Sequence, residues 1–210
     1  MLRAWPLLAM SLLLGALALA CGDDAGEGPA PSPSPTLAPT PMTFAERPEI
    51  TISPDKKYFA TVETTKGTFR IELRPDLAIQ TVNSFVFLAG QGYYDGVTFH
   101  RVIPGFMAQG GDPTGTGSGG PGYTLPAEFS DVPFERGTVG LARSNDPDSG
   151  GSQFFIAYTA QPSLNGQYTV FGKVVEGMDV VDSLTPRDPS NIATPQPPGD
   201  TIIAIVIEEE

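Results

Sequence analysis

The sequence FHRVIPGFMAQGGD, which runs from Phe99 to Asp112, is the stretch of this 210-residue chain that decides the fold. It contains two short apolar runs separated by Pro104-Gly105, and Pro-Gly pairs mark turns. Its only cation is Arg101, and its end is rich in glycine. Short apolar runs interrupted by turn residues are typical of short strands rather than of long helices.

Short apolar runs separated by turn residues also occur on both sides of this stretch. Upstream, KYFATVETTKGTFRIEL (57–73) places Phe69, Ile71 and Leu73 on one face of a strand, and Lys66-Gly67 lies where a hairpin turn is expected. Downstream come four more short apolar runs, GTVGLARS, SQFFIAY, YTVFGKVV and TIIAIVIEE. Several short strands with frequent turns predict a mainly β fold, either a barrel or a sandwich.

Two segments have helical patterns instead. Residues 76–92 carry Val82, Phe85, Val86 and Ala89 at helical spacing and end in glycines, which predicts one amphipathic helix. A second, shorter helix is predicted to start near Met178. The proline-rich residues 185–200 are predicted to form a loop. No internal repeat is present, so residues 55–210 are expected to form one domain.

The first 54 residues have a different character. MLRAWPLLAMSLLLGALALAC has one Arg followed by an uncharged apolar stretch, and residues 1–20 are predicted to be an export signal. Cys21 follows small Ala20, as in the lipobox of bacterial lipoproteins, which predicts lipidation at Cys21. Plain secretion and an uncleaved membrane anchor are the alternatives. Residues 21–54 are rich in proline and are predicted to be a disordered spacer that holds the domain off a membrane.

Composition excludes several classes of function. The chain has 12 Lys and Arg against 24 Asp and Glu, a net charge of −12, which opposes binding to nucleic acid. With one cysteine and one histidine, neither a disulfide framework nor a multi-ligand metal site is expected, and no cofactor is implied. GTGSGG at 115–120 is expected to be a flexible loop rather than a dinucleotide site, because Pro121 follows it and no helix begins there.

Three ordered motifs, FHRVIPGFMAQGGD, GSQFFIAY and LNGQYTVFGKVVEGM, together resemble the cyclophilin family of peptidyl-prolyl cis-trans isomerases. The resemblance covers most of residues 58–185. It implies an eight-stranded antiparallel β-barrel capped by two α-helices. It also implies that the protein isomerises X-Pro bonds in unfolded or flexible protein segments, as a monomer and without a cofactor.

The resemblance also implies the site residues. Arg101 matches the family's catalytic arginine, and Phe106 and Gln109 match residues that contact the proline ring and the substrate backbone. The remaining substrate-binding positions by resemblance are Met107, Ala142, Arg143, Gln153, Phe155, Leu164 and Tyr168.

Three positions depart from well-known eukaryotic members. Arg143 replaces an asparagine, Tyr168 stands where many members have histidine, and Ser163 replaces a tryptophan that contacts cyclosporin, so weak cyclosporin binding is expected. Two other functions remain open from the sequence. One is a non-catalytic module that captures proline-containing loops, and the other is a structural envelope protein. From this sequence we expect an exported isomerase that assists the folding of exported proteins.

Overall fold

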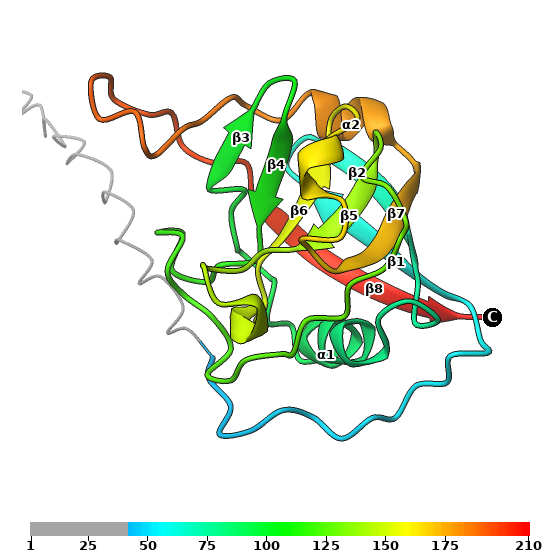
Figure 1. Ribbon diagram of the computed structural model, residues 1–210. Coiled ribbons are helices and arrows are strands. Elements are labelled where there is room, and N and C mark those ends of the chain that lie inside the picture. Colours follow the sequence, from blue (N-terminus) through cyan, green and yellow to red (C-terminus); the bar gives the residue numbers. More distant parts are fainter. Residues whose placement is uncertain (1–41) are drawn as a thin grey trace, which may run out of the picture. The chain divides into compact units, whose positions relative to one another are not determined.

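The computed structural model describes residues 42–210, so the predictions for residues 1–20 and for Cys21 lie outside the described residues. Within the described part, eight strands and two α-helices alternate with loops (Figure 1). The strands are β1 Tyr58–Thr64, β2 Gly67–Leu73, β3 Arg101–Ile103, β4 Met107–Gly110, β5 Thr138–Leu141, β6 Phe154–Ala157, β7 Val170–Glu176 and β8 Ile202–Glu209. The helices are α1 Ile79–Gly90 and α2 Met178–Asp182.

The strands form one antiparallel sheet in the order β3-β4-β6-β5-β7-β2-β1-β8. The sheet curls until the segment before β3 meets the start of β8. There the Phe99 N–H donates to the Asp200 carbonyl at 2.9 Å, and the Ile202 N–H donates to the Val97 carbonyl at 2.8 Å. The predicted eight-stranded antiparallel fold with two helices is therefore confirmed. The two edge strands, β3 and β8, do not pair along their length, and hydrogen bonds from the segment before β3 close the sheet instead.

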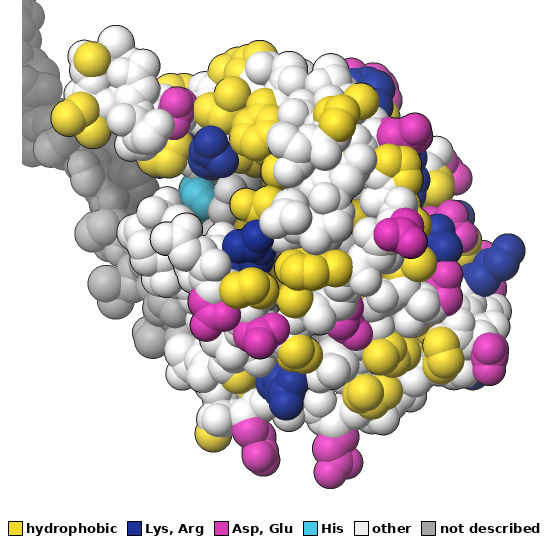
Figure 2. All heavy atoms as spheres, in the orientation of Figure 1, with side chains coloured by type: hydrophobic (Ala, Val, Ile, Leu, Met, Phe, Trp, Pro, Cys, Tyr) yellow, Lys and Arg dark blue, Asp and Glu magenta, His cyan; other side chains and the backbone are white. Residues whose placement is uncertain are grey.

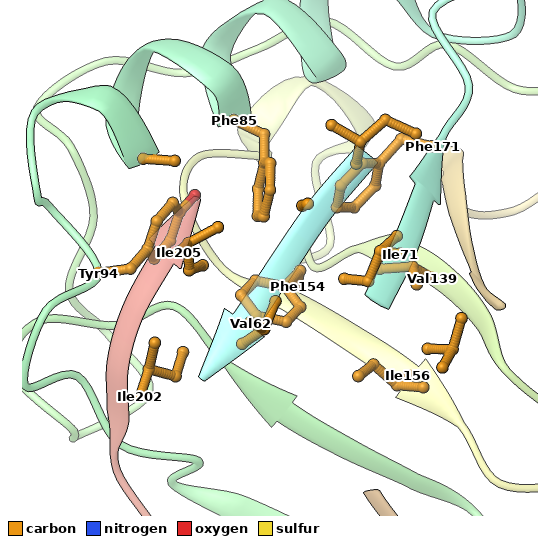
Figure 3. Packing of buried hydrophobic residues seen from close by; sticks show 14 of the residues in the cluster. Val62, Ile71, Phe85, Tyr94, Val139, Phe154, Ile156, Phe171, Ile202 and Ile205 are labelled. Carbon is orange, nitrogen blue, oxygen red and sulfur yellow. The ribbon is translucent and has the colours of Figure 1, made fainter. Parts of the chain in front are cut away.

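The core fills the inside of the curled sheet, and α1 covers one end of it (Figures 1 and 3). Phe85 of α1 lies against three rings, with centroid distances of 5.1 Å to Tyr94, 5.7 Å to Phe154 and 5.5 Å to Phe171. Burying one such side chain contributes about 1.5–3 kcal/mol. The helix begins at Ile79, three residues after the predicted start, because Asp76 and Leu77 lie in the turn that follows β2.

Residues 42–54 differ from the predicted disordered spacer. The Phe44 ring contacts Phe87 at 5.1 Å, and its N–H donates to the Pro121 carbonyl at 2.7 Å. The Asn83 side chain of α1 accepts from the Thr51 N–H and donates to the Glu49 carbonyl. This segment has few apolar residues, but the ring of Phe44 and the side-chain amide of Asn83 hold it against the domain. The folded unit therefore begins before residue 55. We call residues 42–54 the N-terminal strap.

No helix of residues 42–210 combines the length and the apolar character that crossing a bilayer requires.

Replacing Phe44 with alanine should lower the free energy of unfolding by about 1–2 kcal/mol, less than for a fully buried phenylalanine because Phe44 is half-buried. Urea unfolding of the 42–210 domain measures this change. Met42→Ala is the control, because Met42 is 39% exposed and its loss should change stability by less than about 0.5 kcal/mol. If the 42–210 and 55–210 proteins were equally stable, the strap would have no structural role.

Candidate active site

The site begins with the register of three neighbouring strands. Arg101 of β3 lies opposite Gln109 of β4, and Gln109 lies opposite Phe155 of β6. Directly opposed residues in antiparallel strands point to the same face of the sheet. A cation, an amide and an aromatic ring therefore stand in one row across the outer face of the sheet.

A pocket of about 140 Å³ opens above this row. Every predicted catalytic or substrate-binding residue lines it, with the exception of Gln153. Its lining residues are Arg101, Phe106, Met107, Gln109, Ala142, Arg143, Phe155, Leu164 and Tyr168. Figure 2 shows dark blue cationic side chains bordered by yellow hydrophobic ones on the face that carries β3 and β4.

The floor of the pocket is a second hydrophobic cluster, separate from the barrel core. Its buried members are Met107, Phe134, Phe155 and Val170. The rings of Phe134 and Phe155 stack at 5.4 Å, and Tyr168 meets Phe155 edge-on at 5.6 Å. This packing holds Phe155 rigidly, with its ring at the base of the pocket.

Gly140 of β5 makes this stacking possible. A Cβ at this position would lie 2.5 Å from Cζ of Phe155 and 2.7 Å from Cε1 of Phe134. Any side chain there would displace one of the two rings, because carbon atoms do not pack that closely. Gly140 is thus the residue that lets β5 approach the pocket floor.

Sequence reasoning missed Phe134, although it supports the pocket from below. Phe134 lies in DVPFERG, where proline and charged residues surround it and no strand or helix period marks it as buried. Its position is fixed by the Asn165 side chain, which accepts from the Phe134 N–H at 2.8 Å. The only available signal was a single aromatic residue in a polar loop.

Gln109 and Gln153 form a short chain of hydrogen bonds beside the pocket. Gln109 Nε2 donates to Gln153 Oε1 at 2.9 Å, and Gln153 Nε2 donates to the carbonyls of Gly117 and Gly119. Gln153 therefore orients Gln109 and lines an adjoining groove of about 610 Å³ instead of the pocket itself. Within residues 42–210, the amide oxygen of Gln109 has no hydrogen-bond partner, so it can accept from a bound peptide.

One wall of that groove consists of residues 117–124, and Asp112 organises the loop that leads into this wall. Burial disfavours the Asp112 carboxylate, but hydrogen bonds from the Thr114 hydroxyl and from the N–H groups of Thr114, Gly119 and Gly117 outweigh this effect and lower its pKa. The glycine run 115–120, expected to be a flexible loop, is thus held by one carboxylate.

His100 is 2% exposed and lines neither the pocket nor the adjoining groove. Burial lowers the pKa of its imidazole despite the nearby Asp112 carboxylate. A neutral, buried ring with no opening to the pocket fits a scaffold role, as expected from the sequence.

Arg101 is partly exposed, and its guanidinium lies 5.7 Å from the centre of the Phe106 ring. Among the described residues it has neither an ion pair nor a side-chain hydrogen bond, so its five N–H donors face the pocket and solvent. In chemical terms, the site offers an apolar cup, one amide acceptor and two arginines that belong to no ion pair among the described residues, Arg101 and Arg143. It holds no nucleophile next to a base.

Comparison with known proteins identifies this arrangement. A model of the family described as "Cyclophilin type peptidyl-prolyl cis-trans isomerase/CLD" matches residues 59–206. A probable peptidyl-prolyl cis-trans isomerase of Brucella suis is 50% identical over 157 residues, which cover 69% of this chain and 79% of the relative. Peptidyl-prolyl cis-trans isomerase B of Bacillus subtilis is 49% identical over 133 residues, covering 62% of this chain and 91% of the relative.

Solved structures agree with the sequence relatives. A cyclophilin-type isomerase from Cryptosporidium parvum, solved in the presence of the dipeptide Ala-Pro, superposes with a TM-score of 0.65 at 34% identity, covering 71% of this chain and 98% of that chain. With its fold, its motifs and most of its length matched in this way, the chain belongs to the cyclophilin-type peptidyl-prolyl cis-trans isomerase family.

Proposed function

We propose that Arg101, Phe106 and Gln109 carry the reaction in this peptidyl-prolyl cis-trans isomerase, and that its clients are exported proteins. The observation that supports the catalytic assignment most directly is the unpaired Arg101 beside an apolar pocket. In a domain where acidic residues outnumber basic ones, an arginine without a carboxylate partner is available to a substrate.

The reaction sets clear requirements. Rotation about an X-Pro bond breaks the partial double bond of the amide, which presents a barrier of about 18–20 kcal/mol. In the twisted transition state the proline nitrogen regains its lone pair and becomes a hydrogen-bond acceptor. A donor that meets this nitrogen only in the twisted state lowers the barrier without tightening ground-state binding. The guanidinium of Arg101, which bonds to no other described side chain or carbonyl, can donate there, whereas the guanidinium of Arg143 is held by the carbonyls of Gln167 and Ser144.

The apolar residues of the pocket bind the proline ring of the substrate. Phe106, Met107 and Phe155 form a cup that can hold the pyrrolidine ring while the residue before it rotates. The stacking on Phe134 keeps this cup from deforming. Fixing one side of the bond is needed, because otherwise the whole proline would turn with its neighbour.

The polar residues align the peptide. Gln109, oriented by Gln153, can accept a backbone N–H from the substrate. Ala142, whose own N–H donates to the Gln153 carbonyl, borders the same pocket. Leu164 and Tyr168 complete its far side. We propose that an extended peptide lies along Ala142 and Arg143 with its proline in the cup.

Arg101→Ala should lower kcat/KM by about 10- to 100-fold, less than the loss of an enclosed donor because Arg101 is partly exposed. The measurement is cis-trans exchange of a proline-containing peptide with the purified 42–210 domain. Arg74→Ala is the matched control, since Arg74 pairs with Asp76 on the surface and lies outside the pocket.

Two outcomes would contradict this assignment. If Arg101→Ala matched Arg74→Ala in rate, Arg101 would not be the catalytic donor. If peptides bound the domain without faster exchange, the alternative of a non-catalytic proline-binding module would replace it.

We further propose that the protein is a membrane-anchored lipoprotein that acts outside the cytoplasmic membrane as a monomer. The apolar stretch of residues 1–20, followed at once by Cys21 and then by a proline-rich segment, supports this proposal. Isomerisation of X-Pro bonds is slow without catalysis, taking tens to hundreds of seconds, and it limits folding. An anchored isomerase would act where newly exported chains emerge.

The mature protein should begin at Cys21 and carry a diacylglyceryl group, which mass spectrometry of the N-terminal peptide detects. Two acyl chains suffice for stable membrane attachment, so Cys21→Ser should move the protein to the soluble fraction. A bare Cys21, or cleavage at another site, would support plain secretion instead.

A further inference from the structure

The two hollows on the substrate face carry an unusual charge for this protein. The pocket is lined by two charged residues, Arg101 and Arg143, and the adjoining groove by one, Arg143. No Asp or Glu among the described residues lines either hollow. The whole chain has a net charge of −12, so two adjoining hollows lined by cations alone are a local exception.

Arg143 lies where the two hollows meet, because it lines both. Two hydrogen bonds and one cation–π contact hold its side chain in place. Nε donates to the Gln167 carbonyl at 2.9 Å, Nη1 donates to the Ser144 carbonyl at 2.8 Å, and the guanidinium carbon lies 4.5 Å from the centre of the Tyr168 ring. A guanidinium held on an aromatic ring loses little freedom when it binds a further group.

The remaining donors of Arg143 are unused. A guanidinium has five N–H groups, and these two bonds occupy two of them. None of the ion pairs within residues 42–210 includes Arg143.

The nearest carboxylates along the chain have other partners. Asp146 Oδ1 accepts from the Asp148 N–H at 3.0 Å, and Asp148 Oδ1 accepts from the Ala127 N–H at 2.8 Å. Asp146 thus stabilises its own loop, Asp148 links that loop to the segment at Ala127, and neither bonds to the guanidinium. Arg143 therefore presents a fixed and unneutralised positive charge beside the pocket.

We propose that Arg143 is a specificity-determining residue, which makes the isomerase prefer substrates with an Asp or Glu adjacent to the proline. This inference rests on the proposed function, because it places the proline in the pocket beside Arg143. Arginine binds carboxylates through paired N–H donors, which matches the groups that remain unused here. The preference is for a local carboxylate, since the acidic surface repels clients that are acidic throughout.

The expected size follows from exposed ion pairs. Such pairs contribute about 0.2–1 kcal/mol, so the Glu peptide should exceed the Gln peptide in kcat/KM by about 1.4- to fivefold. The Debye length falls from ~10 Å at 0.1 M salt to ~3 Å at 1 M, and the preference should shrink accordingly. A preference based on shape alone would not respond to salt.

The test compares six matched peptides that carry Glu, Gln or Lys either just before or just after one proline. Exchange rates are measured with the 42–210 domain of the wild type and of three variants. Arg143→Gln should bring the ratio of Glu to Gln peptides to one. Arg143→Lys should keep part of that ratio, because it retains the charge without the planar donors. Lys57→Gln removes one charge from an exposed site outside both hollows and should leave the ratio unchanged.

A Glu preference on either side of the proline that Arg143→Gln removes and salt weakens supports the proposal. Equal rates for all six peptides, or a preference that persists in Arg143→Gln, would overturn it while leaving the isomerase activity established. If no peptide were accelerated, the proposed function itself would fail and this inference with it.

Discussion

The register between β3, β4 and β6 is the constraint on which the rest of the site depends. Because side chains alternate across a sheet, a slip of one residue in β3 would move Arg101 to the opposite face. The observed pairing of Arg101 with Gln109, and of Gln109 with Phe155, instead places all three on the outer face. In the mechanism that we propose, isomerisation needs no reactive group, only these side chains held at fixed spacing.

A second consequence of this architecture is that stability and function use different hydrophobic clusters. The barrel core is centred on residues such as Phe85 and Phe154, whereas the pocket floor consists of Met107, Phe134 and Phe155. Phe154 and Phe155 are neighbours in β6 and point to opposite faces, one into each cluster. One short strand thus links the core to the pocket, which keeps the pocket rigid without exposing the core.

The sequence was informative where a residue pattern repeats or a motif is long. It predicted the strands, the main helix and the residues that line the pocket. It failed where tertiary contacts override composition. The strap at 42–54 looked like a continuation of the proline-rich segment, yet Phe44 and the side chain of Asn83 fix its course. The burial of Phe134 could not be predicted for a similar reason, since it depends on stacking with Phe155, which is distant in sequence, and on the absence of a side chain at Gly140.

The central claim is that a proline ring occupies the cup formed by Phe106, Met107 and Phe155, beside Arg101. A crystal structure of the 42–210 domain with the dipeptide Ala-Pro tests it most directly. We expect the pyrrolidine ring against Phe155, with the guanidinium of Arg101 within hydrogen-bond reach of the dipeptide. A dipeptide bound elsewhere, with the cup left to solvent, would contradict the account.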